Sequence, residues 1–347
     1  MNVKTSVLNL GQFPPDRFIS LVRLQEECGY EALWYADERF FREVYAGLTL
    51  AAVNTQRISL GTMVTDPYVR HPAVTAMGIA TLDELSNGRA MLGVGAGVSG
   101  FAEMKVERRK PAQAMREMVA VFRGLLGGDV VDLHGQVIEF DHGRLDFRPI
   151  RADVPVYIAS NGPLGLALAG EIADGAVMQS AVADKLIDWM LQHVSKGATR
   201  VGRDLSDVDV VARVNVCIHV DPKVAKDLMR PSIVRTLVAQ QPEFRTFKTA
   251  GLEIPDKLRQ AVTSLGYTHD PEILAPVAAM IPDEFVDAIT LAGTVDQVST
   301  QVIRMIRLGV THVMIYPMTP DGNVEDVITD FAQKVMPAVR QTVGSDA

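Results

Sequence analysis

The chain has 347 residues, of which 48% are hydrophobic and 22% charged, so it has enough apolar side chains for a large folded core and is not a disordered chain. Its formal net charge of −8 excludes nucleic acid as an expected partner, because phosphate binding needs a basic face. The first residues lack the pattern of a signal peptide, and no apolar run reaches the roughly 18 residues of a membrane span. We therefore expect a cytoplasmic protein without a membrane partner.

Short apolar runs alternate with amphipathic stretches along the chain, which predicts parallel strands joined by helical crossovers. Strands are expected at residues 3–9, 32–36, 58–64, 89–94, 156–159, 175–178, 208–220 and 312–316. Helices are expected at residues 15–28, 46–55, 71–86, 110–126, 163–171, 184–195, 294–308 and 324–340. The stretch 130–147 contains short β-like pieces around two glycines and is predicted to form a hairpin.

The segment 222–282 is polar and mostly helical in pattern, with no strand candidate, so we interpret it as a helical insertion before the last strand. Eight strand candidates separated by helices favour a closed (β/α)₈ TIM barrel over an open doubly wound sheet. No repeat and no low-complexity linker interrupts the chain, which predicts one domain over residues 1–347. Barrel enzymes place their sites at the carboxyl ends of the strands, so the residues that follow each apolar run deserve most weight.

Two adjacent carboxylates, Asp37 and Glu38, follow the second strand. They fit acid–base chemistry or cofactor recognition, and they fit equally a helix cap with a first-turn dipole partner. His71 follows the third strand, directly before a proline that opens a helix. A lone histidine in that position is more typical of a structural cap than of a catalytic base.

After the fourth and fifth expected strands, the candidate binding groups belong to the backbone rather than to side chains. The run 93–97 has the pattern Gly-x-Gly-x-Gly, which suits either a tight turn or a loop that approaches a flat or anionic ligand. Ser160-Asn161-Gly162-Pro163 opens a helix whose free N–H groups suit a phosphate, although a well-capped helix would have the same pattern.

Other signatures are absent from the sequence. The cysteines, Cys28 and Cys217, are too far apart for a disulfide framework or a zinc motif, and Cys28 is expected to pack as a small apolar residue. The histidines have no metal-ligand spacing, so no metal site is predicted. Hydrolase and nucleotide-binding motifs are missing as well.

Taken in order, these segments resemble the luciferase-like family of flavin- and deazaflavin-dependent oxidoreductases, and within it the methylenetetrahydromethanopterin reductase branch. The residues that carry the resemblance are Leu60-Gly61-Thr62, Asp66-Pro67-Tyr68-Val69-Arg70-His71-Pro72, 80–90, 92–97, 154–159, 161–163, 173–175, 281–282, 286–288, 292–294 and 309–313. The similarity covers nearly the whole chain and is most specific in its central third.

The resemblance implies a TIM barrel of the bacterial luciferase-like type with a cofactor at its mouth. It implies a cis peptide bond between Met63 and Val64 that backs the flavin-type ring, and a position for Asp37 near the polar edge of that ring. Asp37 and Glu38 are the implied catalytic residues, with Glu38 as the acid–base group. The implied cofactor-binding residues are Asp37, Met63, Val64, Asp66, Ala96, Gly97, Asn161, Gly162, Leu164 and Gly165.

Several positions depart from related enzymes. Deazaflavin-linked sugar-phosphate dehydrogenases carry histidine in place of Glu38, a catalytic glutamate in place of Val98, and cationic residues in place of Val182 and Ala288. These differences argue against a sugar-phosphate substrate. Pterin reductases carry a carboxylate on the first strand near Ser6, which argues against pterin reduction.

The function implied by the resemblance is hydride transfer between coenzyme F420 and a small organic substrate. One alternative is an FMN-dependent two-component monooxygenase, which uses O₂ and receives reduced flavin from a partner flavin reductase. Another is a non-catalytic flavin-binding barrel, which the loss of the glutamate at Val98 would suit. Family members commonly dimerise, so a homodimer is expected, with residues 73–85 as part of its surface.

Overall fold

The computed structural model describes residues 3–97, 99–266, 268 and 270–345. The strands are β1 (Lys4–Asn9), β2 (Ala32–Tyr35), β3 (Ser59–Thr62), β4 (Ala90–Val94), β5 (Val131–His134), β6 (Glu139–Gly143), β7 (Val156–Ala159), β8 (Gly175–Gln179), β9 (Asp209–Ile218), β10 (Thr290–Gly293) and β11 (His312–Pro317). All eight predicted strands are present, as β1 to β4, β7 to β9 and β11.

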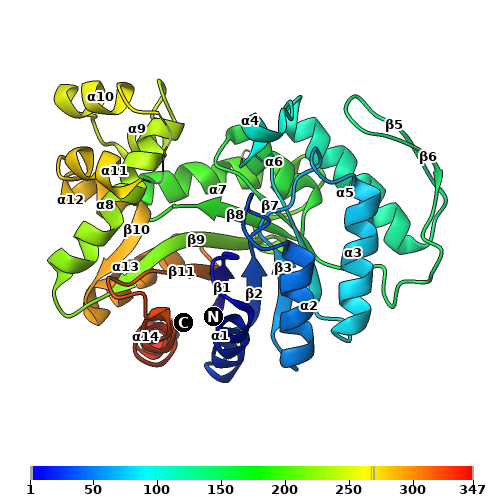
Figure 1. The fold of residues 1–347 in the computed structure, drawn as a ribbon, viewed down its shortest axis with the longest axis horizontal. Coiled ribbons are helices and arrows are strands. Elements are labelled where there is room, and N and C mark those ends of the chain that lie inside the picture. The colour runs from blue at the N-terminus through cyan, green and yellow to red at the C-terminus, as the bar shows by residue number, and fades with distance from the viewer. Residues whose placement is uncertain (1–2, 98, 267, 269, 346–347) are drawn as a thin grey trace. The chain divides into compact units, whose positions relative to one another are not determined.

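Helices follow the strands in the order that the sequence predicts (Figure 1). They are α1 (Pro15–Glu27), α2 (Val44–Asn54), α3 (Pro72–Leu85), α4 (Phe101–Met104), α5 (Pro111–Gly127), α6 (Pro163–Ile172), α7 (Asp184–Thr199), α8 (Pro222–Ala239), α9 (Arg245–Ala250), α10 (Asp256–Thr263), α11 (Pro271–Ala278), α12 (Asp283–Ile289), α13 (Val295–Arg307), α14 (Val324–Asp330) and α15 (Met336–Ser345). A short 3₁₀ helix at Leu205–Asp207 precedes β9, and a π-helical turn at Phe331–Val335 joins the last two helices. The alternation of eight parallel strands with helices is that of a (β/α)₈ TIM barrel, which confirms the predicted fold class.

Proline at the first helical position sets many of the helix starts. It is favoured there because a backbone N–H at that position has no acceptor within the helix, so proline loses nothing by lacking one. Its fixed φ also suits the helix. The helices that begin in this way are α1, α3, α5, α6, α8 and α11. The N-cap of α3 is His71, whose Nδ1 accepts the Ala73 N–H at 3.2 Å, so this histidine is a helix cap.

The chain divides into two compact units, each described separately. The N-terminal unit comprises Lys4–Met178 and Gln192–Val211. Its strands run in parallel in the order β1-β2-β3-β4-β7-β8. Helix α2 packs between α1 and α3, as Figure 1 shows. The strands β1 to β4 and β7 are almost entirely buried, which explains the nearly continuous apolar character of β2, β4 and β7.

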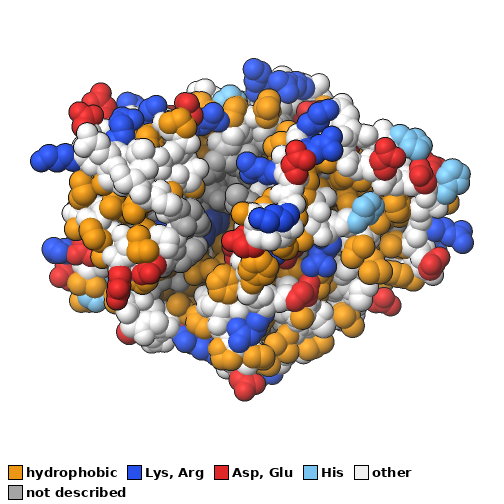
Figure 2. Space-filling model, turned by 45° about the horizontal axis from the view of Figure 1, so that its top comes forward, with side chains coloured by type: hydrophobic (Ala, Val, Ile, Leu, Met, Phe, Trp, Pro, Cys, Tyr) orange, Lys and Arg blue, Asp and Glu red, His pale blue; other side chains and the backbone are white. Residues whose placement is uncertain are grey.

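An antiparallel hairpin of β5 and β6 extends from the N-terminal unit, as the sequence predicted for 130–147. Histidine and acidic side chains gather on this exposed ribbon, and they lie together at the right-hand end of Figure 2. His142 Nδ1 lies 2.6 Å from Asp132 Oδ1, and His134 Nδ1 lies 3.6 Å from Asp141 Oδ1. Because all four side chains are exposed, these pairs are weak surface interactions.

The C-terminal unit comprises Met1–Val3, Gln179–Leu191 and Ala212–Ala347. Its strands are ordered β10-β9-β11, and its helical segment α8 to α11 occupies the range predicted as an insertion. The sequence prediction missed β10, which pairs in parallel with β9 from Thr290 opposite Asn215 to Gly293 opposite Ile218. In the described part of the chain, no helix is long and apolar enough to cross a membrane.

Candidate active site

An arginine joins two of the predicted site carboxylates in the N-terminal unit. Arg39 Nη1 donates to Asp37 Oδ1 at 2.8 Å, and Arg39 Nη2 donates to Asp66 Oδ2 at 2.8 Å. The side chains of Asp37, Arg39 and Asp66 are only 9%, 13% and 4% exposed. This clamp ties the loop after β2 to the loop after β3, and the sequence prediction did not include Arg39. In the sequence, Arg39 could have been recognised only by its position directly after Asp37 and Glu38.

Asp37 is the most perturbed of the predicted site residues. Burial raises the pKa of its carboxyl group, while Arg39, the Thr65 hydroxyl and Arg70 act in the opposite direction. Its Oδ2 atom is buried and, within the described residues, completes no hydrogen bond; the same holds for Thr65 Oγ1. Buried polar atoms in folded proteins are nearly always paired, so Oδ2 is an acceptor available to the N–H of a ligand.

Glu38 is held from a third strand end. The hydroxyl of Ser99, in the loop after β4, donates to Glu38 Oε1, and it lies 3.1 Å from the Arg39 carbonyl oxygen. Ser99 therefore orients the carboxylate that the resemblance assigns to acid–base chemistry, and no sequence pattern indicated it. Val98, the position at which related dehydrogenases carry a glutamate, lies outside the described residues.

The segments after β3 and β4 pack tightly together. The Met63–Val64 peptide bond is cis, as the resemblance implied. Thr65 N–H donates to the Gly93 carbonyl at 3.0 Å, and Gly95 N–H donates to the Thr65 carbonyl at 2.9 Å. A Cβ atom on Gly95 would lie 2.3 Å from Val64 Cγ2, so a side chain at this position would collide with Val64.

Gly97 is required for a second reason. Its φ of +60° lies in the left-handed region, and a Cβ atom there would lie 2.9 Å from Asp66 Cβ. The glycine run thus lets the backbone around Ala96 and Gly97 lie against Val64 and Asp66. The structure brings these four predicted residues into one cluster with Asp37 and Glu38.

The predicted phosphate loop is at the start of α6. Gly162 is the N-cap, no side chain caps the helix, and Ser160 Oγ accepts the Gly162 N–H at 3.1 Å. The first N–H groups of a helix have no intrahelical partner, so those of Leu164 and Gly165 are available to an anion. The Leu164 side chain is 74% exposed, so its backbone N–H is the group that suits binding.

Parallel pairing relates this loop to the carboxylate cluster. Strand β7, which leads to Ser160 and Asn161, pairs in parallel with β4 through Leu92 opposite Val156. The carboxyl ends of both strands therefore point to the same edge of the sheet. All predicted site residues follow strand ends on this edge of the N-terminal unit.

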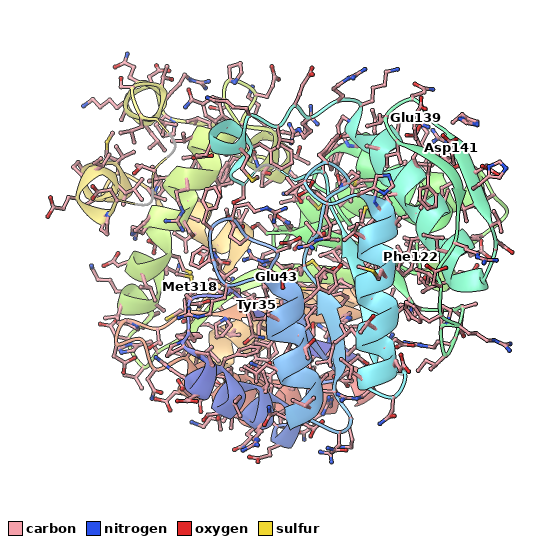
Figure 3. The ribbon with its side chains drawn as sticks, turned by 45° about the vertical axis from the view of Figure 1, so that its right-hand side comes forward. Tyr35, Glu43, Phe122, Glu139, Asp141 and Met318 are labelled. Carbon is pink, nitrogen blue, oxygen red and sulfur yellow. The ribbon has the colours of Figure 1, made fainter. Side chains whose placement is uncertain are left out.

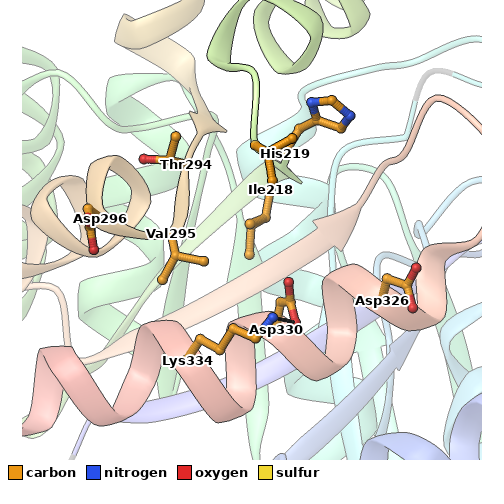
Figure 4. Close-up of a pocket in the computed structure, with 9 residues that line it drawn as sticks. Ile218, His219, Thr294, Val295, Asp296, Asp326, Asp330 and Lys334 are labelled. Atoms are coloured by element: carbon orange, nitrogen blue, oxygen red, sulfur yellow. Dashed lines mark ion pairs between the residues drawn. The ribbon is translucent and has the colours of Figure 1, made fainter.

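A separate cavity of about 690 Å³ lies in the C-terminal unit (Figure 4). His219 and Thr294 line it just after β9 and β10, and Lys334 pairs with Asp330 at 2.7 Å beside it. None of the predicted site residues lines this cavity. In the described residues, no group of three or more histidine, cysteine or acidic side chains could hold a metal ion.

A TIM barrel with buried carboxylates grouped at its strand ends is the architecture of a barrel enzyme. The chain belongs to the luciferase-like family, described as luciferase-like monooxygenase, which matches residues 2–312. It is therefore an enzyme of that family, as the sequence resemblance predicted.

Relatives from several organisms extend this comparison. A 5,10-methylenetetrahydromethanopterin reductase of Methanolobus tindarius is 32% identical over 84% of this chain and 87% of its own length. An F420-dependent glucose-6-phosphate dehydrogenase of Nakamurella multipartita is 27% identical over 96% of this chain and 95% of its own. The structure of the coenzyme F420 dependent tetrahydromethanopterin reductase from Methanopyrus kandleri superposes with a TM-score of 0.85 at 28% identity, covering 97% of this chain and 99% of that one.

Proposed function

We propose that this enzyme is an oxidoreductase that transfers a hydride between coenzyme F420 and a small organic substrate. The observation that carries the proposal is the Asp37 carboxylate, which is buried, clamped by Arg39 and left with an unpaired acceptor atom at a strand end. Relatives named as F420-dependent over nearly the full chain support the choice of cofactor.

The residues present suit a deazaflavin with a phosphate-bearing side chain. Asp37 Oδ2 would accept an N–H from the polar edge of the ring, and the Met63–Val64 segment would support its face. The N–H groups at the start of α6, which have no intrahelical partner, would receive the phosphate. Coenzyme F420, when bound, supplies the carbon that accepts or donates the hydride.

Glu38 is the proposed proton-transfer group. Ser99 donates to its Oε1, and Oε2 makes no hydrogen bond within the described residues, so Oε2 is the atom that would exchange a proton with the substrate heteroatom. Hydride transfer at an alcohol or imine carbon requires such a partner proton, and a positioned carboxylate typically contributes about 10²–10⁴-fold to the rate.

The C-terminal unit supports a substrate without a phosphate group. Val182 and Ala288, where sugar-phosphate dehydrogenases carry cationic residues, are both buried. They lie together, with the Val182 N–H 3.2 Å from the Ala288 carbonyl oxygen. Two buried apolar side chains provide no charge for a phosphate at these positions, so we propose a small organic substrate that lacks one.

The cofactor assignment is tested by titrating the purified protein with coenzyme F420 and, separately, with FMN, followed by absorbance and fluorescence. Coenzyme F420 should bind more tightly than FMN. Asp37→Asn should weaken that binding by about tenfold or more, because it removes an acceptor from a buried charged hydrogen bond. Asp129→Asn, at an exposed loop position, is the matched control and should bind as the wild type does.

The family description favours one competing function, an FMN-dependent monooxygenase. Tight FMN binding with no measurable coenzyme F420 binding would replace the proposal with that function. Its flavin would then come from a partner reductase. Binding of coenzyme F420 that is unchanged in Asp37→Asn would instead remove Asp37 from the proposed site.

A further inference from the structure

A second cavity, of about 220 Å³, lies in the N-terminal unit between the N-terminal ends of α1 and α2. None of the predicted cofactor or catalytic residues lines it. Its lining is mostly apolar and includes Phe13, Phe18, Ala46 and Leu50, together with Tyr35 and the two charged residues Arg42 and Glu43. Figure 3 shows Tyr35 and Glu43 close together at the start of α2.

This cavity is on the helix side of β2. Successive side chains of a strand point to opposite faces of the sheet. Trp34 points to one face, where its Nε1 donates to Ser6 Oγ at 3.2 Å and its ring lies 5.0 Å from that of Tyr157. Tyr35 points to the other face and packs edge-on against Phe18 at 5.1 Å. The cavity therefore lies between β2 and the two helices that cover it, and it opens to solvent beside the exposed residues Arg42 and Glu43.

The Tyr35 hydroxyl has no hydrogen-bond partner among the described residues. Tyr35 is 2% exposed, and across residues 3–97 and the rest of the described chain its hydroxyl makes no hydrogen bond. The tip of the ring reaches α2, since a Cβ atom on Gly47 would lie 2.5 Å from Tyr35 Cζ. Tyr35 lines the cavity, so its hydroxyl can donate to or accept from the polar end of a ligand there.

The two charged residues beside the cavity, Arg42 and Glu43, differ in how far their side chains are already paired within the protein. Glu43 uses both carboxylate oxygens, accepting the Ala46 N–H at 2.8 Å and pairing with Arg70 at 2.9 Å. Arg42 donates to the Gly11 carbonyl at 2.8 Å and has no carboxylate in ion-pair contact within the described residues. Burial raises the pKa of Tyr35 while the Arg42 charge acts against it, so the guanidinium is within electrostatic reach of the phenol.

We propose that this cavity binds a small aromatic carboxylate, with its ring against Phe18 and Tyr35 and its carboxylate received by Arg42 and the Tyr35 hydroxyl. An apolar cavity of about 150 Å³ can hold benzene, so 220 Å³ has room for one ring and a carboxylate. Arginine is well suited to the planar carboxylate group. This site is independent of the proposed cofactor and its chemistry.

Benzoate is the probe, with benzyl alcohol and benzylamine as neutral and cationic analogues of similar size. Binding to the full chain is measured by calorimetry and by ligand-observed NMR. Benzoate should bind with one-to-one stoichiometry and more tightly than either analogue. Arg42→Gln should weaken benzoate about tenfold or more, because a charge-assisted hydrogen bond is lost. Ala46→Leu should abolish binding by filling the cavity that Ala46 lines.

Arg57→Gln is the matched control, since Arg57 is an exposed arginine at the opposite end of α2. It should leave benzoate affinity unchanged, and circular dichroism should show that all three variants are folded. The proposal is overturned if benzoate does not bind at millimolar concentration. It is also overturned if Ala46→Leu binds benzoate normally, or if benzylamine binds as well as benzoate.

Discussion

The Arg39 clamp offers the sharpest test of the site as a folded unit. Arg39→Gln removes the cation shared by Asp37 and Asp66 and leaves two buried carboxylates without it. Breaking a buried ion pair in this way costs about 3–5 kcal/mol in the free energy of unfolding. Arg116→Gln is the control, because its bridge to Glu171 is equally short at 2.8 Å but 40% and 19% exposed. A surface pair of this kind is worth about 0–1 kcal/mol.

The loss caused by Arg39→Gln should depend on pH. The pKa of Asp37 is already raised by burial, and Arg39 is the main group that opposes this shift, so its removal raises that pKa further. A carboxyl whose pKa is higher in the folded state favours folding when protonated and opposes it when charged. The deficit of the variant should therefore be largest at neutral pH and should shrink as the pH falls through the folded-state pKa.

Urea denaturation at neutral pH and at about pH 5 measures both quantities, with fluorescence or circular dichroism as the signal. If Arg39→Gln loses no more stability than Arg116→Gln at neutral pH, the carboxylates do not depend on the clamp. A deficit that stays constant on acidification would contradict the electrostatic explanation and point to lost packing instead.

Four further results are expected. Glu38→Gln cannot transfer a proton, so turnover should fall about a hundredfold or more while cofactor affinity stays within a few-fold; wild-type turnover would remove the acid–base role. Burial raises the pKa of the Cys217 thiol to about 11, so iodoacetamide at neutral pH should leave it unmodified in the folded protein, as mass spectrometry can check. Calorimetry should show one unfolding transition for residues 1–347, and two resolved transitions would contradict a single domain. Sedimentation should show a homodimer that Met77→Glu dissociates, because Met77 and Val74 on α3 are 48% and 43% exposed; a wild-type monomer at micromolar concentration would refute it.

Much of the fold follows from local pattern. The order of the eight barrel strands is readable because most of them, such as β2, β4 and β7, are short apolar runs, and a strand buried on both faces needs such a run. Prolines such as Pro72 and Pro163 indicate helix starts for a similarly local reason, since a fixed φ and a missing N–H suit only the first turn. The alternation of apolar runs with helical stretches was enough to predict that Asp37 and Glu38 stand at a strand end.

Strand β10 shows where local pattern fails. Its four residues, Thr290–Gly293, include small side chains and stand between two helices, so no periodicity distinguishes them. They are a strand because β9 provides a partner more than 70 residues earlier in the chain. Strand formation of so short a segment depends on that pairing and burial rather than on its own propensity.

The electrostatics of the candidate site also come from contacts distant in sequence. Asp37 and Glu38 are adjacent in the chain, but Arg39 connects the first to Asp66 while Ser99, from another loop, holds the second. Sequence alone determined which carboxylates stand at the strand ends. The burial of Asp37, its ion pair with Arg39 and its unpaired Oδ2 atom arise only when the loops after β2, β3 and β4 pack together, so they could not be read from the chain.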